Sequence, residues 1–298
     1  MPGFHTAVLT VLAMLAFAAN SLLCRLALQS HSMDAGSFTA VRLVSGALVL
    51  ALVVRLRAPS AAAAGSGRWG SAAWLFVYAA AFSLAYMQLP AGVGALLLFG
   101  AVQATMVGVG VGVGLWRGER LALCQWAGLV LALGGLVVLL RPGLSAPPWG
   151  AAGLMLLAGV AWGAYSLRGK GAKDPVGVTA GNFLRAAPLA LLMWGLMAGQ
   201  ASVSVAGLAS ALCSGALTSG LGYVAWYAAL PQLKAGTAAS VQLSVPLLAA
   251  IGAVLLLGES WTLRLSLAGA AILGGIALVV LARPGPPPAV NVAPGRQP

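Results

Sequence analysis

Apolar stretches of about 20 residues follow one another along this chain, separated only by short polar breaks. A stretch of that length crosses the hydrocarbon core of a bilayer as a helix, because backbone groups in lipid must be hydrogen-bonded within the segment. Only 7% of the residues are charged, against about a quarter in soluble proteins. The sequence therefore predicts an all-α integral membrane protein.

Hydropathy and breaker residues divide the chain into ten predicted transmembrane helices. Their ranges are 6–28, 36–56, 70–89, 92–115, 122–140, 150–168, 177–198, 206–230, 236–257 and 262–282. An even number of spans puts both termini on one side of the membrane. The loops on that side hold nearly all loop Lys and Arg residues, against Arg141 and Arg264 on the other side. This bias predicts cytoplasmic termini, and we expect a multi-pass protein of a bacterial inner membrane.

The two halves of the chain repeat one another. LVVLLRPG closes the first half at 136–143 and LVVLARPG closes the second at 278–285, with one residue changed. Gly118-Glu119 likewise matches Gly258-Glu259 at nearly the same offset. Each half holds five helices, an odd number, so the sequence predicts two inverted five-helix repeats. The predicted domains are a first repeat at 6–140, a linker at 141–149, a second repeat at 150–282 and a disordered cytoplasmic tail at 283–298.

The pattern resembles the drug/metabolite transporter superfamily, and within it the EamA type with two EamA repeats. Five features of the sequence carry the resemblance: Asn20-Ser21 with Arg25, Arg42, the tyrosines of the third and eighth spans, the Gly-Glu pairs, and Pro246 thirteen residues before Glu259. The resemblance implies a transporter whose first, third, fourth, sixth, eighth and ninth helices line a central cavity. Inverted repeats of this kind open a site near the bilayer midplane to each side in turn.

Two arginines lie within predicted spans, Arg42 in the second and Arg185 in the seventh. Ionisable residues inside a membrane are candidates for function, so each could attract a substrate carboxylate or hold a gate. Alternatively, each could bind backbone carbonyls or extend to the headgroups. Pro246 is predicted to act as a hinge in the ninth span.

Aromatic and amide side chains on the cavity-lining helices provide the hydrogen-bonding groups and walls of a small-molecule site. The predicted substrate-binding residues are Asn20, Tyr86, Gln103, Trp162, Tyr165, Tyr227 and Gln242. Tyr78 and Tyr223 fit either the cavity or the aromatic belt at the membrane interface. No Asp or Glu lies within a span, which favours neutral or zwitterionic substrates over cations.

These features together predict a secondary transporter that exports a small polar or amphipathic metabolite such as an amino acid. The alternatives are a non-transporting membrane scaffold or receptor and an intramembrane lipid-modifying enzyme. No catalytic residues, metal site or cofactor are expected, because the acidic residues and histidines do not cluster. The Lys and Arg residues lie at segment ends rather than on one surface, so nucleic acid is not an expected partner. The expected partners are the small-molecule substrate and the lipid bilayer, and the expected assembly is a monomer or a homodimer.

Overall fold

The computed structural model describes residues 3–29, 32–57, 66–116, 122–141, 146–233 and 235–281. The predicted tail at 283–298, the Gly118-Glu119 turn and residues 142–145 of the predicted linker lie outside the described residues. Within the described part, ten helical spans are long and apolar enough to cross a membrane. The prediction of an all-α integral membrane protein is confirmed.

Most spans are single α-helices whose ends lie within a few residues of the predicted ones. These are α1 (Phe4–Gln29), α2 (Ala35–Arg57), α3 (Trp69–Tyr86), α4 (Ala91–Trp116), α5 (Leu123–Leu140), α6 (Trp149–Gly169), α7 (Pro175–Leu196) and α12 (Leu263–Leu281). The capping residues agree with the sequence at α7, where Asp174 accepts a hydrogen bond from the Gly177 N–H and Pro175 occupies the first turn.

Two spans are interrupted, which the hydropathy pattern did not predict. The eighth consists of α8 (Val205–Leu212), the π-helical segment η3 (Cys213–Leu221), α9 (Gly222–Ala229) and a short 3-10 turn, η4 (Leu230–Gln232). The ninth consists of α10 (Ala235–Gln242) and α11 (Ser244–Leu257), with a break at Leu243. A further 3-10 turn, η2 (Ala198–Gln200), precedes the loop to α8.

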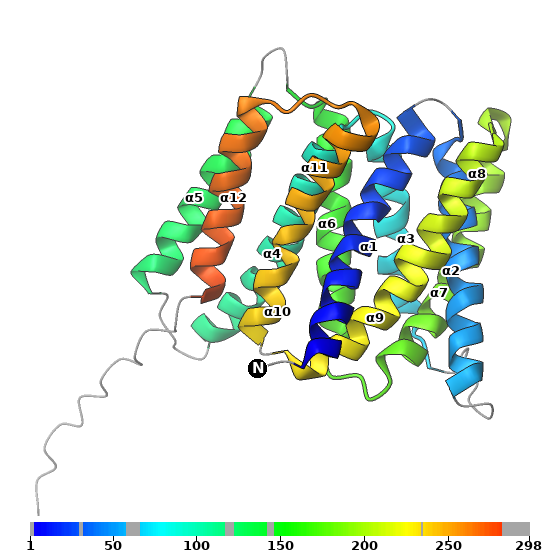
Figure 1. Ribbon diagram of the computed structural model, residues 1–298, viewed down its shortest axis with the longest axis horizontal. Helices are drawn as coiled ribbons and strands as arrows, with labels where there is room; N and C mark the ends of the chain where they lie inside the picture. The colour runs from blue at the N-terminus through cyan, green and yellow to red at the C-terminus, as the bar shows by residue number, and fades with distance from the viewer. Residues whose placement is uncertain are drawn as a thin grey trace, which may run out of the picture.

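The helices stand side by side, and α1 begins at the same end of the bundle where α12 ends (Figure 1). We call this the terminal end and the other the opposite end; α6 begins at the opposite end, so it runs antiparallel to α1. Helices of the two halves interleave. The main pairs are α2 with α7, α3 and α4 with α6, α1 with α9 and α11, and α5 with α12.

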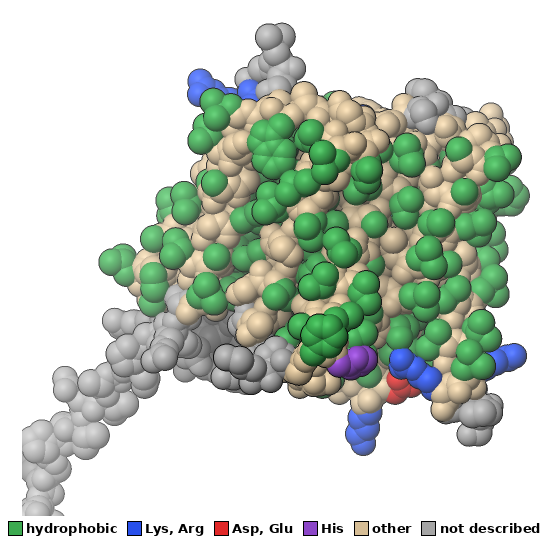
Figure 2. Space-filling view, viewed as in Figure 1, with side chains coloured by type: hydrophobic (Ala, Val, Ile, Leu, Met, Phe, Trp, Pro, Cys, Tyr) green, Lys and Arg blue, Asp and Glu red, His purple; other side chains and the backbone are tan. Residues whose placement is uncertain are grey.

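The surface of the bundle carries apolar side chains along the helices, as Figure 2 shows for one face. Large exposed side chains such as Leu52, Leu133 and Leu192 are apolar, as contact with lipid tails requires. Basic residues gather near the helix ends. Those described at the terminal end are Arg55, Arg57, Arg68, Arg168, Lys170 and Lys173, and those at the opposite end are Arg25, Arg141 and Arg264.

Small residues bring α2 and η3 into close contact. A Cβ placed on Gly215 would overlap the Ser45 hydroxyl and the carbonyl oxygen of Arg42, and one on Gly46 would lie 3.1 Å from the carbonyl oxygen of Gly215. Helices in membranes associate through such close backbone approach. The contact holds the π-helical segment directly against the helix that carries Arg42.

Candidate functional site

Arg42 lies in the protein interior, where it is the largest of the fully buried side chains, with 1% of its surface exposed. Its Nη2 donates to the Tyr78 hydroxyl at 2.9 Å and its Nε donates to the Ser219 hydroxyl at 3.2 Å. The guanidinium carbon also lies 5.1 Å from the centre of the Tyr78 ring and 4.9 Å from that of Phe82. Ring faces of this kind stabilise a cation that has left water.

No acidic side chain pairs with Arg42 in the described part of the chain. The ion pair found there joins Arg25 and Glu259. The Nη1 of Arg42 is buried and has no hydrogen-bond partner among the described residues. A buried charge without a counter-charge costs free energy, and a buried donor without an acceptor adds to that cost. The surroundings of Arg42 are therefore a buried positive site in which one hydrogen-bond donor has no partner among the described residues.

Asn20, on α1, links Arg42 to the second half of the chain. Its Nδ2 donates to the Tyr78 hydroxyl at 3.4 Å, and its Oδ1 accepts from the hydroxyls of Ser214 at 2.7 Å and Thr218 at 3.3 Å. Ser214, Thr218 and the Arg42 partner Ser219 all belong to η3. Such π-helical turns change which side chains share a face, and they occur frequently at functional sites.

An aromatic cluster lies next to these polar groups. The ring centroid of Trp162, on α6, lies 4.9 Å from that of Tyr78, 5.3 Å from that of Tyr165 and 5.2 Å from that of Tyr223. Trp162 stacks on Tyr223 at an interplanar angle of 28°. Tyr78 and Tyr223 are 5% and 4% exposed. Both therefore lie in the interior, and the alternative that they belong to an interfacial belt does not apply to them.

A second polar group lies around Tyr165, which accepts from Nδ2 of Asn182 at 3.4 Å. Thr179 and Tyr227 are close to Tyr165. The Oδ1 of Asn182 accepts from the backbone N–H of Arg68 at 2.9 Å, at the beginning of α3. This group extends the site from the aromatic cluster toward the terminal end.

The structure places four predicted residues away from Arg42, and none of the four is hydrogen-bonded to it. Tyr86 is fully buried near the opposite end, where its hydroxyl donates to the carbonyl of Ala91 at 3.3 Å. Gln103 is buried on α4, and Gln242 is half-buried as the last residue of α10. Arg185 is half-buried and donates to the carbonyl of Gly181 in its own helix at 3.0 Å. Arg185 thus makes the backbone contact that the sequence left open as an alternative.

Pro246 is buried as the third residue of α11, directly after the break at Leu243. A proline has no N–H to bond the carbonyl four residues earlier, which is that of Gln242. The position of the break therefore follows from Pro246.

The sequence prediction missed the hydroxyl residues of η3, namely Ser214, Thr218 and Ser219. Ser214 and Thr218 were the available signal, since residues four apart share one helix face, whereas Ser219 lies off that face in a regular helix. Phe82 was also missed, because a single phenylalanine in a membrane span carries no sign of contact with a cation.

A separate contact joins several elements at the opposite end. Glu259, in the turn between α11 and α12, accepts from the Ala91 N–H at 2.9 and 2.8 Å with its two oxygens, and from Arg25 Nε at 3.3 Å. Arg25 Nη1 also donates to the Tyr86 carbonyl at 3.0 Å. A carboxylate is favoured at the first N–H groups of a helix such as α4. Around this contact lies a hollow of about 480 Å³, lined also by Gln88 and Thr262.

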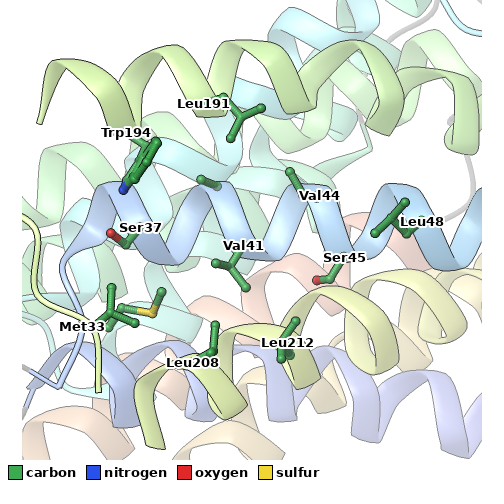
Figure 3. Close-up of a pocket in the computed structure, with 12 residues that line it drawn as sticks. Met33, Ser37, Val41, Val44, Ser45, Leu48, Leu191, Trp194, Leu208 and Leu212 are labelled. Atoms are coloured by element: carbon green, nitrogen blue, oxygen red, sulfur yellow. The ribbon is translucent and has the colours of Figure 1, made fainter. Parts of the chain in front are cut away.

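An apolar groove of about 400 Å³ lies on the side of the bundle (Figure 3). Leu191 and Trp194 of α7 border it on one side, Leu208 and Leu212 of α8 border it on the other, and α2 forms its floor. These four bordering side chains are exposed, so the groove faces the lipid and not the aromatic cluster. Within the described residues, no group of three His, Cys, Asp or Glu side chains is placed to hold a metal ion.

Comparison with known proteins agrees with this architecture. The EamA-like transporter family matches residues 149–281. PA1977, an uncharacterized protein of Pseudomonas aeruginosa, is 59% identical over 285 residues, which cover 96% of this chain and 98% of that protein. The chain belongs to the EamA-like transporter family. Its membership confirms the resemblance found in the sequence, and members of the EamA family are transporters rather than enzymes.

A solved crystal structure of another protein shares the fold of this EamA-family chain. The two are 20% identical and superpose with a TM-score of 0.66, over 93% of this chain and 97% of the other. The arrangement of the spans is thus one that another chain adopts with few of the same side chains. The site must be argued from the residues of this chain.

Proposed function

We propose that this EamA-family chain is a secondary transporter that exports a small polar or amphipathic metabolite, such as an amino acid, by alternating access. One observation carries the proposal: both halves of the chain contribute to a single buried cluster. Asn20, Arg42 and Tyr78 come from the first half, and Trp162, Ser214 and Tyr223 come from the second. A substrate bound among them would contact both halves at once, so movement of one half against the other would change its access.

The pattern of helix contacts supports the inverted repeat. If α1 corresponds to α6, α3 to α9 and α4 to α11, then the pairing of α3 and α4 with α6 matches that of α9 and α11 with α1. The pairs α2–α7 and α5–α12 correspond to themselves under the same relation. Asp34 and Asp174 also cap the equivalent helices α2 and α7, each accepting an N–H three residues on.

The charge distribution supports cytoplasmic termini in a bacterial inner membrane. Among the described residues, more basic side chains lie at the terminal end than at the opposite end. Basic residues concentrate on the cytoplasmic side of such proteins. In this orientation the Arg25–Glu259 contact faces outward, and the Tyr165–Asn182 group lies nearer the cytoplasm.

The test is flux in proteoliposomes containing the purified full chain, across a panel of amino acids and their deaminated carboxylic acids. Trp162→Ala should lower flux by about tenfold, because the bound substrate would lose the indole face of the aromatic cluster and one aromatic contact contributes roughly 0.5–1.5 kcal/mol. Trp126→Ala is the matched control, since Trp126 lies on α5 with 55% of its surface exposed. It should transport like the unmodified protein.

Absence of flux for every compound, with protein that melts cooperatively, would contradict the transport proposal. Equal flux in both tryptophan variants would instead contradict a substrate site in the aromatic cluster.

A further inference from the structure

We infer that the central site binds an organic monoanion through its carboxylate, with Arg42 supplying the counter-charge. The inference rests on the proposed transport function and narrows its substrate class. It shifts the expectation from a neutral or zwitterionic molecule, such as an amino acid, to one with a net charge of minus one.

The charge of the site requires one negative charge on the ligand. Arg42 contributes one positive charge, and its recorded partners, Tyr78, Ser219 and the Phe82 ring, are neutral. Glu259, the acidic residue of the recorded ion pair, is bound to Arg25 and Ala91 at the opposite end. A single carboxylate brings the charge of the cluster to zero, whereas a phosphate dianion would leave an excess negative charge in a buried site.

The N–H groups of Arg42 that remain free favour a carboxylate as the negatively charged group. A guanidinium has five N–H groups in a fixed plane, and hydrogen bonds to the described residues occupy only Nε and one N–H of Nη2. Nη1 has no partner among the described residues, and Nη2 keeps a second N–H. When the Tyr78 hydroxyl takes the Nη2 hydrogen on the Nε side, Nη1 and Nη2 can bind both oxygens of a carboxylate in parallel. A carboxylate bound in this way would satisfy the buried donor that lacks a partner.

The surroundings define the rest of the ligand. Asn20, Ser214 and Thr218 offer hydroxyl and amide groups beside Arg42, and the stacked rings of Trp162 and Tyr223 offer a flat apolar wall. An ammonium group would find no carboxylate among these residues. The site thus fits a carboxylic acid with a flat or apolar body better than the corresponding amino acid. Since the rings contact one another, the ligand must separate Trp162 from a neighbouring ring when it enters.

A set of compounds with one phenyl ring and different charges tests the inference by binding. Phenylacetate is the anion, phenylacetamide its neutral counterpart, phenylalanine the zwitterion, phenethylamine the cation and phenyl phosphate the dianion. Ligand binding to the folded state raises the melting temperature of the purified full chain. We expect phenylacetate to raise it at lower concentrations than the other four compounds.

Three variants test whether phenylacetate binding depends on Arg42. Arg42→Gln removes the charge and should weaken phenylacetate binding roughly 10- to 100-fold, the range expected for hydrogen bonds to a charged group. Arg42→Lys keeps the charge without the paired donors and should give an intermediate loss. Arg55→Gln is the control, since it removes a charge from an exposed position on the same helix and should leave binding unchanged.

Binding and flux separate the two proposals. Phenylacetamide or phenylalanine binding as tightly as phenylacetate, phenylacetate affinity unchanged in Arg42→Gln, or no stabilisation by phenylacetate would each overturn the inference. In those cases proteoliposome flux of other compounds still decides whether the chain is a transporter. Arg42-dependent binding of phenylacetate without flux of any carboxylate would support the anion site and contradict transport.

Discussion

Arg42 and Arg185 show how far a sequence can predict the role of a single residue. Both are arginines within apolar spans, and the sequence offered the same two interpretations for each. The structure separates them: Arg42 contacts Tyr78 and Ser219 in the interior, whereas Arg185 bonds a carbonyl of its own helix. The sequence could not distinguish them because the difference depends on which helix packs against each face.

Asp34 provides a prediction at the same scale. It is 8% exposed, and it accepts hydrogen bonds from the N–H groups of Ser37 at 2.8 Å and Ser202 at 3.1 Å, which join the start of α2 to the loop before α8. Burial raises the pKa of the Asp34 carboxyl, but hydrogen bonds from Ser37 and Ser202 outweigh it and hold the pKa below the ordinary 3.8. The ionised form therefore stabilises the fold above that pH, and the stabilisation is lost as the pH falls through the lowered pKa.

Asp34→Asn should destabilise the protein by about 1–3 kcal/mol at pH 7, the range for a hydrogen bond to a charged group. The difference in melting temperature from the unmodified protein should shrink as the pH is lowered below about 4. Asp174→Asn is the control, because Asp174 is exposed and its carboxylate accepts from Gly177 alone among the described residues. A constant difference for Asp34→Asn from pH 7 to pH 3 would show that the carboxylate charge plays no part.

At the scale of the elements, hydropathy predicted the ten spans well because length and apolar content alone decide whether a helix crosses a bilayer. It did not predict η3. The π-helical turn accompanies the close approach of Gly215 to Ser45 and the Arg42 carbonyl, a contact between distant segments that no local pattern encodes. The same segment carries Ser219, which lies off the face of Ser214 and Thr218 in a regular helix, so the omission of this Arg42 partner and the error in the element share one cause.

The break between α10 and α11 leads to a prediction about Pro246. Pro246→Ala supplies an N–H that can bond the Gln242 carbonyl, so the ninth span should become a more continuous helix. If the break is the proposed hinge, flux in proteoliposomes should fall several-fold while the melting temperature is kept or rises. Pro188→Ala is the matched control, because Pro188 lies exposed within α7, which continues through it. Unchanged flux in Pro246→Ala would contradict a hinge at Pro246.

At the scale of the whole molecule, the repetition in the sequence predicts two inverted halves, and that stays a prediction, while the helices of the two halves interleave. The sequence could not show which contacts join the helices at the opposite end of the bundle. The contact of Glu259 with Ala91 and Arg25 joins α1, α4 and the turn between α11 and α12 at the opposite end. In the proposed orientation, these bonds must break when the site opens outward.

Cys24 can report that opening, because it is buried on α1, one residue before Arg25. In a variant with Cys124 and Cys213 replaced by serine, Glu259→Gln should increase the rate at which an impermeant maleimide, added outside, labels Cys24 several-fold. Arg264→Gln is the control, since Arg264 donates to the Arg141 carbonyl beside α5 and not to this contact. Equal labelling rates with and without Glu259 would exclude it as part of the outer closure.

The unpaired charge of Arg42 has a consequence for membrane voltage, if the proposed transport of a monoanion holds. A voltage does work only on net charge that moves through the field, roughly 2.3 kcal/mol for one elementary charge across 100 mV. With a bound monoanion the cluster around Arg42 would be neutral, so its movement across the membrane would not respond to voltage. Without the anion the cluster would carry one positive charge, so an inside-negative potential would change only the rate at which the unloaded protein returns.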